Sequence, residues 1–176
     1  LILKLKEAGL SAVKVGVESA DSEVLKNESR YTVGKDEQLE KIRELENNKI
    51  KILSEINFPH SIGLLYSSFT FFLGFKVNSG EYKVMGLAPY GKPIFKEKIL
   101  NNLIEIFEDG SFQMNQKYFN YSTGLTMTNN NFNKLFKMNR RNEDEPLNQK
   151  HLDLAASIQK VIEIIVVKLA KKAFDL

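Results

Sequence analysis

Apolar and polar residues follow two different periods along the first third of the chain. Apolar residues recur at helical spacing in residues 1–8 and 35–46, and each of these stretches predicts a helix. The short apolar runs at residues 12–17 and 49–56 instead alternate in the way typical of a strand. This order of helix, strand, helix and strand predicts an α/β unit at the start of the chain.

The pattern of apolar and polar residues changes in the middle of the chain, where a long and almost wholly apolar segment begins. Residues 61–73 predict a helix with Ser61 as its N-cap and Gly74 as its C-terminal stop. Because this helix is apolar on every side, we expect it to be buried or to pack against a partner. Residues 81–88 predict a short helix that Pro89 breaks.

The rest of the chain predicts two further helices separated by less regular sequence. Residues 94–107 form an amphipathic pattern, whereas residues 111–133 carry weak alternation that favours strands or loops, with a turn at 129–131. A charged connection at 140–146 then leads to residues 149–174, where apolar residues recur every three or four positions. At a rise of about 1.5 Å per residue, this last segment predicts a helix about 40 Å long.

Composition narrows the classes of chemistry open to this protein. With 43% hydrophobic and 27% charged residues, the chain is typical of a globular domain and too apolar for a disordered one. It has 0 cysteines, which excludes disulfides, thiolate zinc sites, iron–sulfur clusters and cysteine nucleophiles. Its formal charge of +3 is too small to predict a nucleic-acid or membrane partner. Charges interrupt the longest apolar stretch, so we expect no membrane span and a soluble, cytoplasmic protein.

The most specific pattern combines glycine, serine, glutamate and lysine within residues 77–91. Small residues in such a loop allow backbone N–H groups to approach a phosphate or ribose, and the start of the following helix adds partial positive charge. This arrangement predicts a nucleotide contact. The alternative is a capped surface helix followed by a proline–glycine turn, because glycine and proline often serve only as turn residues.

Two histidines and an arginine pair are further candidate ligand-binding residues. His60 and His151 lie far apart in sequence, so the helical histidine pair of many metal sites is absent, and we assign no metal ligand. His60 follows a proline, where it can also hydrogen-bond a turn. Arg140 and Arg141 can hold a substrate anion, and the alternative is a solvated patch with the acidic residues that follow. The aromatic run at residues 69–75 favours a core over a base-stacking surface, since no basic residues interleave it.

Three long runs of sequence carry a family resemblance: Lys51–Tyr66, Gly74–Gly91 and Leu154–Gln159. Through them, residues 49–176 resemble the N-terminal domain of the nodulation-type and antibiotic-type O-carbamoyltransferases. The resemblance implies an α/β fold, namely a partial actin-like ATPase (ribonuclease-H-like) domain, preceded here by the short barrel-like α/β unit. It also implies an ATP-dependent transfer of a carbamoyl group from carbamoyl phosphate, through a carbamoyl-adenylate, to a small-molecule hydroxyl acceptor.

The same resemblance, extended to threonylcarbamoyl-transfer enzymes, implies a set of site residues. The nucleotide-binding residues are expected to be Ser79, Gly80, Glu81, Lys83, Gly86, Tyr90 and Gly91. In this set, Lys83 is a candidate phosphate partner and Glu81 a candidate ribose or water partner. His60, Arg140 and Arg141 are the candidate substrate-binding residues, and no catalytic residue is assigned.

Several motifs that the resemblance leads us to expect are missing. The chain has no His-x-x-x-His pair, no early Asp-Gly segment and no Gly-Gly-x-Ala-Leu-Asn loop, and Asn139 stands where many relatives have proline. The divalent metal or iron of the full-length family therefore lacks matching ligands, and the separate adenylating domain is missing too. We expect a fragment that is weakly active or inactive alone and that acts with the missing segments or as a homo-oligomer.

A second resemblance is carried by residues 12–21. Through them, residues 1–48 resemble a piece of the cobalamin-associated radical S-adenosylmethionine enzymes, in which Glu18 and Ser19 would face the cofactor ribose. Such enzymes need three cysteines for their cluster, and this chain has 0. The sequence therefore predicts two partial domains joined near residue 48. The alternatives to a partial carbamoyltransferase are a non-catalytic interaction module, whose exposed helix at residues 61–73 needs a partner, and, less favoured, a radical-enzyme fragment.

Overall fold

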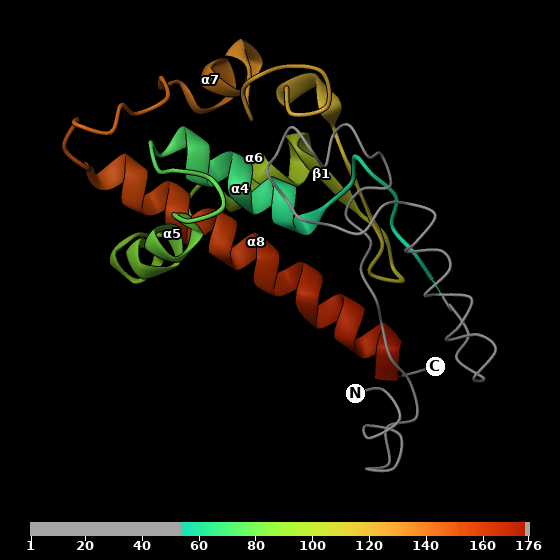
Figure 1. Ribbon diagram of the computed structural model, residues 1–176. Helices are drawn as coiled ribbons and strands as arrows, with labels where there is room; N and C mark the ends of the chain where they lie inside the picture. Colours follow the sequence, from blue (N-terminus) through green and yellow to red (C-terminus); the bar gives the residue numbers. More distant parts are fainter. Residues whose placement is uncertain (1–53, 175–176) are drawn as a thin grey trace, which may run out of the picture. The chain divides into compact units, whose positions relative to one another are not determined.

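The computed structural model describes residues 54–174, and Figure 1 shows their course. The chain divides into one unit up to Pro59 and a second from His60 onward, so nearly all described residues belong to the second unit. The elements are α4 (Ile62–Phe72), α5 (Glu81–Leu87), η1 (Ala88–Tyr90), α6 (Lys96–Asn102), β1 (Ile104–Ile106), β2 (Phe112–Met114), η2 (Gln116–Tyr118), α7 (Asn130–Phe136) and α8 (Gln149–Phe174). Helices α4, α5 and α6 and the turn η1 all contact α8, the long red helix of Figure 1.

Helix α4 is held at both ends by the residues that the sequence predicts. The Ser61 hydroxyl accepts a hydrogen bond from the Leu64 N–H at 3.2 Å. Gly74 ends the helix with a φ of +76°, a left-handed conformation that glycine adopts without strain. The buried residues of α4 are Leu64, Leu65, Ser67, Ser68, Phe69, Thr70 and Phe72. The prediction that this helix is exposed and needs a partner is therefore wrong, because the domain covers it with its own side chains.

An aromatic cluster forms the centre of the core between α4 and α7. The ring centroid of Phe132 lies 5.2 Å from that of Phe69, 4.8 Å from Phe72 and 4.9 Å from Phe136. Phe119 completes the cluster, with its centroid 6.1 Å from that of Phe132. All five rings are buried. Edge-to-face and tilted pairs at these distances add a favourable quadrupole term to the burial of apolar area, so the predicted core role of the phenylalanine run is confirmed at its two buried members.

Helix α6 is shorter than the pattern over residues 94–107 predicts, because a strand replaces its second half. Strand β1 pairs antiparallel with β2, with Ile104 opposite Met114. Gly110, at a φ of +81°, forms the turn between the strands. Ile104 and Ile106 fit an amphipathic helix and a strand equally well, so the pairing with β2 decides their conformation. The strand predicted near residue 112 is confirmed.

The second half of the domain begins with α7 and ends with α8. The asparagine run predicted as a turn instead begins a helix: the Asn129 side chain accepts a hydrogen bond from the Asn131 N–H at 2.9 Å and caps α7. The predicted long helix is confirmed as the 26 residues of α8, and residues 139–148 form the predicted irregular connection before it. None of the helices described between residues 54 and 174 is long and apolar enough to cross a membrane.

The described residues are thus mostly helical, with one two-stranded antiparallel sheet. This composition is more helical than the α/β class that the alternating pattern predicts. The helices and strands predicted before residue 54, the barrel-like unit and the candidate residues Glu18 and Ser19 lie outside the described residues.

Candidate functional site

The predicted nucleotide segment, residues 77–91, has an inner and an outer face. Val84 and Gly80 are buried, and Glu81 and Gly91 are half-buried against the rest of the domain. The exposed residues of the segment include Ser79, Tyr82, Lys83, Met85, Gly86 and Tyr90. The predicted site residues therefore fall into two groups. Gly80, Glu81 and Gly91 are packed against the domain and have a structural role, whereas a ligand can reach the exposed residues.

The carboxylate of Glu81 holds the loop that precedes α5. Its Oε1 atom accepts hydrogen bonds from the Ser67 hydroxyl at 2.8 Å and from the Asn78 N–H at 2.9 Å, and its Oε2 atom accepts one from the Gly80 N–H at 3.2 Å. Burial by itself would raise the pKa of Glu81, but these hydrogen bonds outweigh it and leave the pKa below its usual value of 4.5. The charged carboxylate thus ties the loop to α4, and its predicted ribose contact stays a prediction.

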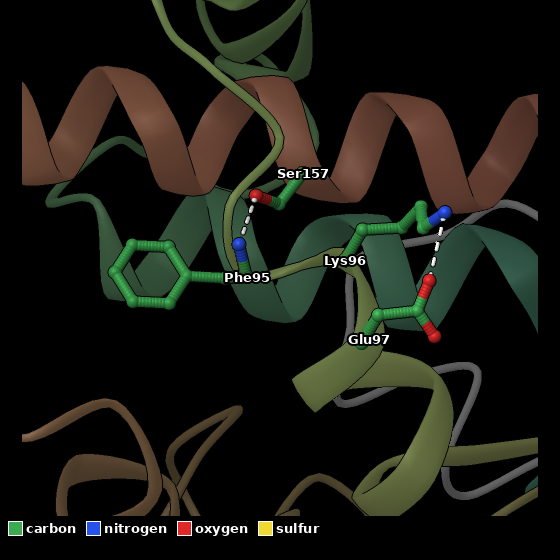
Figure 2. Close-up of polar contacts among 4 residues, drawn as sticks. All are labelled: Phe95, Lys96, Glu97 and Ser157. Carbon is green, nitrogen blue, oxygen red and sulfur yellow. Dashed lines mark hydrogen bonds and ion pairs between the residues drawn. The ribbon is translucent and has the colours of Figure 1, made fainter.

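The turn after α5 is fixed to the first half of α8. A Cβ atom built on Gly91 would lie 2.0 Å from the Leu152 carbonyl oxygen, so only glycine fits this approach. The Lys92 N–H donates to Asp153 Oδ1 at 2.8 Å, and the Phe95 N–H donates to Ser157 Oγ at 3.0 Å. Figure 2 shows the second of these bonds beside the ion pair of Lys96 and Glu97, whose N···O distance is 2.8 Å. Two buried polar residues of α8, Asp153 and Ser157, thereby position the chain that follows the candidate site.

A matched pair of glycine substitutions distinguishes the two faces. Gly91→Ala forces a methyl group into the α8 backbone, and we expect a loss of about 1–3 kcal/mol of unfolding free energy, as for other overpacked sites. Gly86→Ala places its Cβ where nothing lies within 4 Å, and we expect a gain of about 0.5–1 kcal/mol, because alanine is the better helix former. Urea unfolding of both variants measures the two effects, and a destabilised Gly86→Ala variant would contradict this assignment.

Lys83 and Arg141 meet at one aromatic ring. The Lys83 ammonium lies 5.6 Å from the centroid of Phe75, and the Arg141 guanidinium carbon lies 5.1 Å from it. Both contacts are within the range of a cation–π interaction. Neither cation forms a salt bridge with another described residue. The structure therefore brings together one candidate from the nucleotide set and one from the substrate set, at the end of α4.

Arg140 and Arg141 bind the C-terminal carbonyls of α4. Arg140 donates from Nε to the Phe71 carbonyl at 3.0 Å, and Arg141 donates from Nε to the Leu73 carbonyl at 2.6 Å. The Arg141 side chain also donates from Nη1 to the backbone carbonyls of Glu143 and Glu145. Arg141 is only 5% exposed, so the prediction of a solvated patch is wrong for this residue. Cations at this position satisfy unpaired carbonyls and complement the helix dipole.

His60 contacts the β1–β2 hairpin and not the Phe75 ring. Its Nδ1 atom accepts a hydrogen bond from the Met114 N–H at 2.9 Å, which satisfies an outward-facing N–H of β2. His60 has a structural hydrogen bond as expected, but its partner is a strand 54 residues along the chain and not the turn at which His60 stands. Its predicted contact with substrate stays a prediction.

A half-buried hydrogen bond joins α4 and α8, and sequence reasoning missed it. The Tyr66 hydroxyl donates to Gln159 Oε1 at 3.0 Å. Burial, with a further contribution from the Glu81 charge, raises the pKa of Tyr66 to about 12. In the sequence, the only sign of this contact is a polar residue within each of two largely apolar helical runs. Polar residues are mostly exposed to solvent, so this sign does not identify a contact between the helices.

His151 replaces the usual glutamate in a capping box at the start of α8. The Asn148 side chain accepts from the His151 N–H at 3.3 Å, and His151 Nδ1 accepts from the Asn148 N–H at 3.1 Å. The second bond requires a neutral imidazole. Burial, aided by the positive charge of Arg141 and opposed by the negative charge of Glu145, lowers the pKa of His151 below its ordinary value of 6.5.

This capping box predicts an acid-sensitive stability. A histidine whose pKa is depressed in the folded state contributes stability that is fully present above 6.5, its ordinary pKa, and decreases as the pH falls below that value. We expect unfolding free energy measured between about pH 7.5 and pH 5 to fall on acidification, and His151→Gln to flatten the curve. Gln keeps a side-chain acceptor and does not titrate. Equal slopes for the two proteins would contradict the role of His151.

No group of three or more His, Cys, Asp or Glu side chains that could hold a metal ion occurs among residues 54–174. The residues described here therefore do not fit the metal site that the family resemblance implies, and we derive no step through a metal.

The comparison with known proteins assigns the chain to a family. Residues 33–175 match the family described as Carbamoyltransferase N-terminus, and the chain belongs to this family. The match includes α4 to α8 and the whole candidate segment.

Relatives in bacteria extend this assignment. The chain is 56% identical to protein sll1178 of Synechocystis over 121 residues. The aligned region is 69% of this chain and 20% of that protein. It is 33% identical over 118 residues to nodulation protein NolNO of Sinorhizobium fredii, covering 67% of this chain and 16% of that protein. It is 31% identical over 113 residues to nodulation protein NolO of Bradyrhizobium diazoefficiens, covering 63% and 18%. The chain thus spans a fifth or less of the length of these relatives.

Proposed function

We propose that this chain is part of an ATP-dependent O-carbamoyltransferase, in which residues 77–91 contact the adenylate. The observation that carries the proposal is the family match over residues 33–175, which includes a segment with exposed, ligand-accessible residues. In this reaction a carbamoyl group passes from carbamoyl phosphate, through a carbamoyl-adenylate, to a hydroxyl of a small molecule. The proposal includes an actin-like, ribonuclease-H-like arrangement for the complete domain.

Four of the predicted site residues have a defined part in this proposal. Lys83 supplies an exposed positive charge for a phosphate oxygen, and Ser79 supplies a hydroxyl at the loop that precedes α5. Glu81 acts from the inside, because its carboxylate holds the loop in place through Ser67 and Asn78. Arg141 fixes the ring of Phe75, against which Lys83 lies.

The proposal also predicts that the isolated chain transfers carbamoyl groups weakly or not at all. The relatives are about five to six times as long as the region matched here, since that region is 16–20% of their length. The adenylating step, the metal or iron of the family and the acceptor site belong to the remainder of such a protein, supplied in one polypeptide or by association with other chains.

Isothermal titration calorimetry tests the nucleotide contact directly. We expect the chain to bind ATP and a non-hydrolysable carbamoyl-adenylate mimic, and Lys83→Ala to weaken both by about tenfold, the loss of one charge-assisted contact. Lys160→Ala, which removes an exposed lysine of α8 paired with Glu163, is the matched control. Absence of binding by the unmodified chain would refute the proposal.

A further inference from the structure

The edge of β1 that faces away from β2 carries backbone groups that are free to pair with another strand. Within the hairpin, the Phe107 N–H donates to the Ser111 carbonyl at 2.9 Å. Because antiparallel strands exchange hydrogen bonds at alternate residues, Ile104 and Ile106 direct their N–H and C=O groups away from β2. Among residues 54–174, no hydrogen bond to these outward groups occurs.

The opposite edge of the hairpin is covered by the domain itself. There the outward N–H of Met114 donates to His60 Nδ1 at 2.9 Å. Free strand edges are sites at which further strands pair, and folded proteins commonly cover them. Within the part of the chain that the structure describes, the domain therefore covers the edge of β2 and leaves the edge of β1 open.

A pocket of about 670 Å³ lies against the hairpin, between the end of α6 and the second half of α8. Its lining includes Ile104 and Ile106 of β1, Leu100 of α6, and Ile164 and Lys168 of α8. Apart from the buried Ile104, these side chains are half-buried, so they offer partly exposed apolar surface beside the free backbone groups. This combination suits an extended peptide, because backbone pairing gives affinity and side-chain contacts give specificity.

The charge on this edge distinguishes two possible occupants. Glu105, between the two isoleucines, is exposed, forms no salt bridge with another described residue, and lies opposite the uncharged Gln113 of β2. A second copy of β1 that paired through both isoleucines would place its own Glu105 opposite this one. Like charges directly opposite each other destabilise a sheet, whereas opposite charges stabilise it. The edge is therefore complementary to a strand with a basic residue at this position.

We propose that the outer edge of β1 is a docking site for an extended segment of another polypeptide, which adds a strand to the hairpin and carries a basic residue between two apolar residues. The two apolar residues pair with Ile104 and Ile106 and lie on the same face of the sheet as these isoleucines, because side chains alternate between the two faces. The basic residue lies opposite Glu105. This interaction surface is separate from the proposed nucleotide segment and goes beyond the proposed function.

A matched set of peptides tests this docking site in the full chain. The probe is a peptide of sequence Thr-Val-Lys-Val-Thr, acetylated and amidated at its ends, and its binding is followed by NMR of the backbone amides. One control peptide carries N-methyl groups on both valine nitrogens, which removes the donors that face β1 in antiparallel pairing. A second control peptide has glutamate in place of lysine.

Two charge variants of the chain complete the test. Glu105→Lys reverses the charge on the edge, and Glu108→Lys makes the same change at an exposed position in the turn after β1. Circular dichroism melts report whether both variants remain folded, and we expect their melting temperatures to stay close to that of the unmodified chain, since both positions are exposed.

We expect the probe to shift the amide signals of Ile104 and Ile106 and to slow their hydrogen exchange, and the N-methylated peptide to do neither. Reversal of one charge, in the peptide or by Glu105→Lys, should weaken binding about fivefold, the size of a cross-strand charge pair. The glutamate peptide should bind Glu105→Lys more tightly than it binds the unmodified chain. Glu108→Lys should bind the probe as the unmodified chain does.

Three results would overturn the proposal. The first is equal binding of the probe and the N-methylated peptide, the second is a set of shifts that omits Ile104 and Ile106, and the third is no shift at millimolar probe. Self-association is followed by size-exclusion chromatography with light scattering. A dimer whose formation itself shifts the two isoleucine signals would make this edge a contact between copies of the chain, and would overturn its assignment to another polypeptide.

Discussion

Phe132→Ala is expected to destabilise the protein by about 3–5 kcal/mol, the loss typical of a fully buried phenylalanine. Its ring contacts four others, those of Phe69, Phe72, Phe119 and Phe136, so truncation removes these ring contacts together. The rings come from α4, α7 and the segment after η2. They are buried in a well-packed core, and a cavity there is filled only in part by relaxation.

Urea unfolding, followed by circular dichroism, measures this effect. Phe174→Ala is the matched control, because Phe174 is 92% exposed at the end of α8 and the same truncation there should change stability by less than about 0.5 kcal/mol. Phe132→Leu should fall between the two, since it keeps most of the apolar volume and loses the ring pairs. A loss below about 1 kcal/mol for Phe132→Ala would mean that the cluster is not the centre of the core.

The helices that the sequence predicts best are those whose ends carry local signals. Helix α8 has a strong apolar period over all 26 residues, and α4 has a capping serine and a terminal glycine, so both are confirmed close to their predicted bounds. The β1 and β2 hairpin is predicted only in its second strand. Ile104 and Ile106 fit both the helical period and the strand period. Their pairing with residues of β2, ten or fewer positions along the chain, makes this segment a strand.

In the candidate site too, features set by nearby residues are predictable from the sequence, and features set by packing against distant elements are not. The sequence correctly predicts that residues 77–91 form a loop, a short helix and a turn, because the glycine and proline residues that end the helix lie within the segment. It does not indicate which side chains face inward. That Glu81 bonds Ser67 and that Gly91 meets α8 are consequences of packing between elements, and no pattern within the segment distinguishes them from ligand contacts.

Buried Arg141 is the clearest example of a residue whose sequence context misleads. Three acidic residues follow it within four positions, a pattern typical of a solvated charged loop. In the structure the guanidinium instead donates hydrogen bonds to backbone carbonyls, and it forms no salt bridge with these acidic side chains. Backbone carbonyls carry no sequence signature, which is why this role emerges only from the fold.

Replacing Arg141 by alanine is therefore expected to cost about 2–4 kcal/mol of unfolding free energy. The substitution leaves the buried Leu73 carbonyl without its donor, which costs about 1–3 kcal/mol, and it removes the hydrogen bonds to the carbonyls of the exposed residues Glu143 and Glu145, which water can partly replace. Arg140→Ala, which removes the single hydrogen bond to the Phe71 carbonyl and a contact with the Phe71 ring, should cost about 1 kcal/mol and serves as the matched control.

A second measurement separates the loss of this charge from general damage to the fold. The Arg141 guanidinium helps to lower the pKa of His151, so removal of the cation should raise that pKa toward its ordinary value of 6.5. NMR titration of the two histidines follows this shift in Arg141→Ala and in Arg141→Lys. Lysine keeps the charge but lacks the planar fork of donors, so it should preserve the lowered pKa of His151 while recovering only part of the stability. A His151 pKa that is the same in all three proteins would show that Arg141 acts on α4 alone and is not coupled to the start of α8.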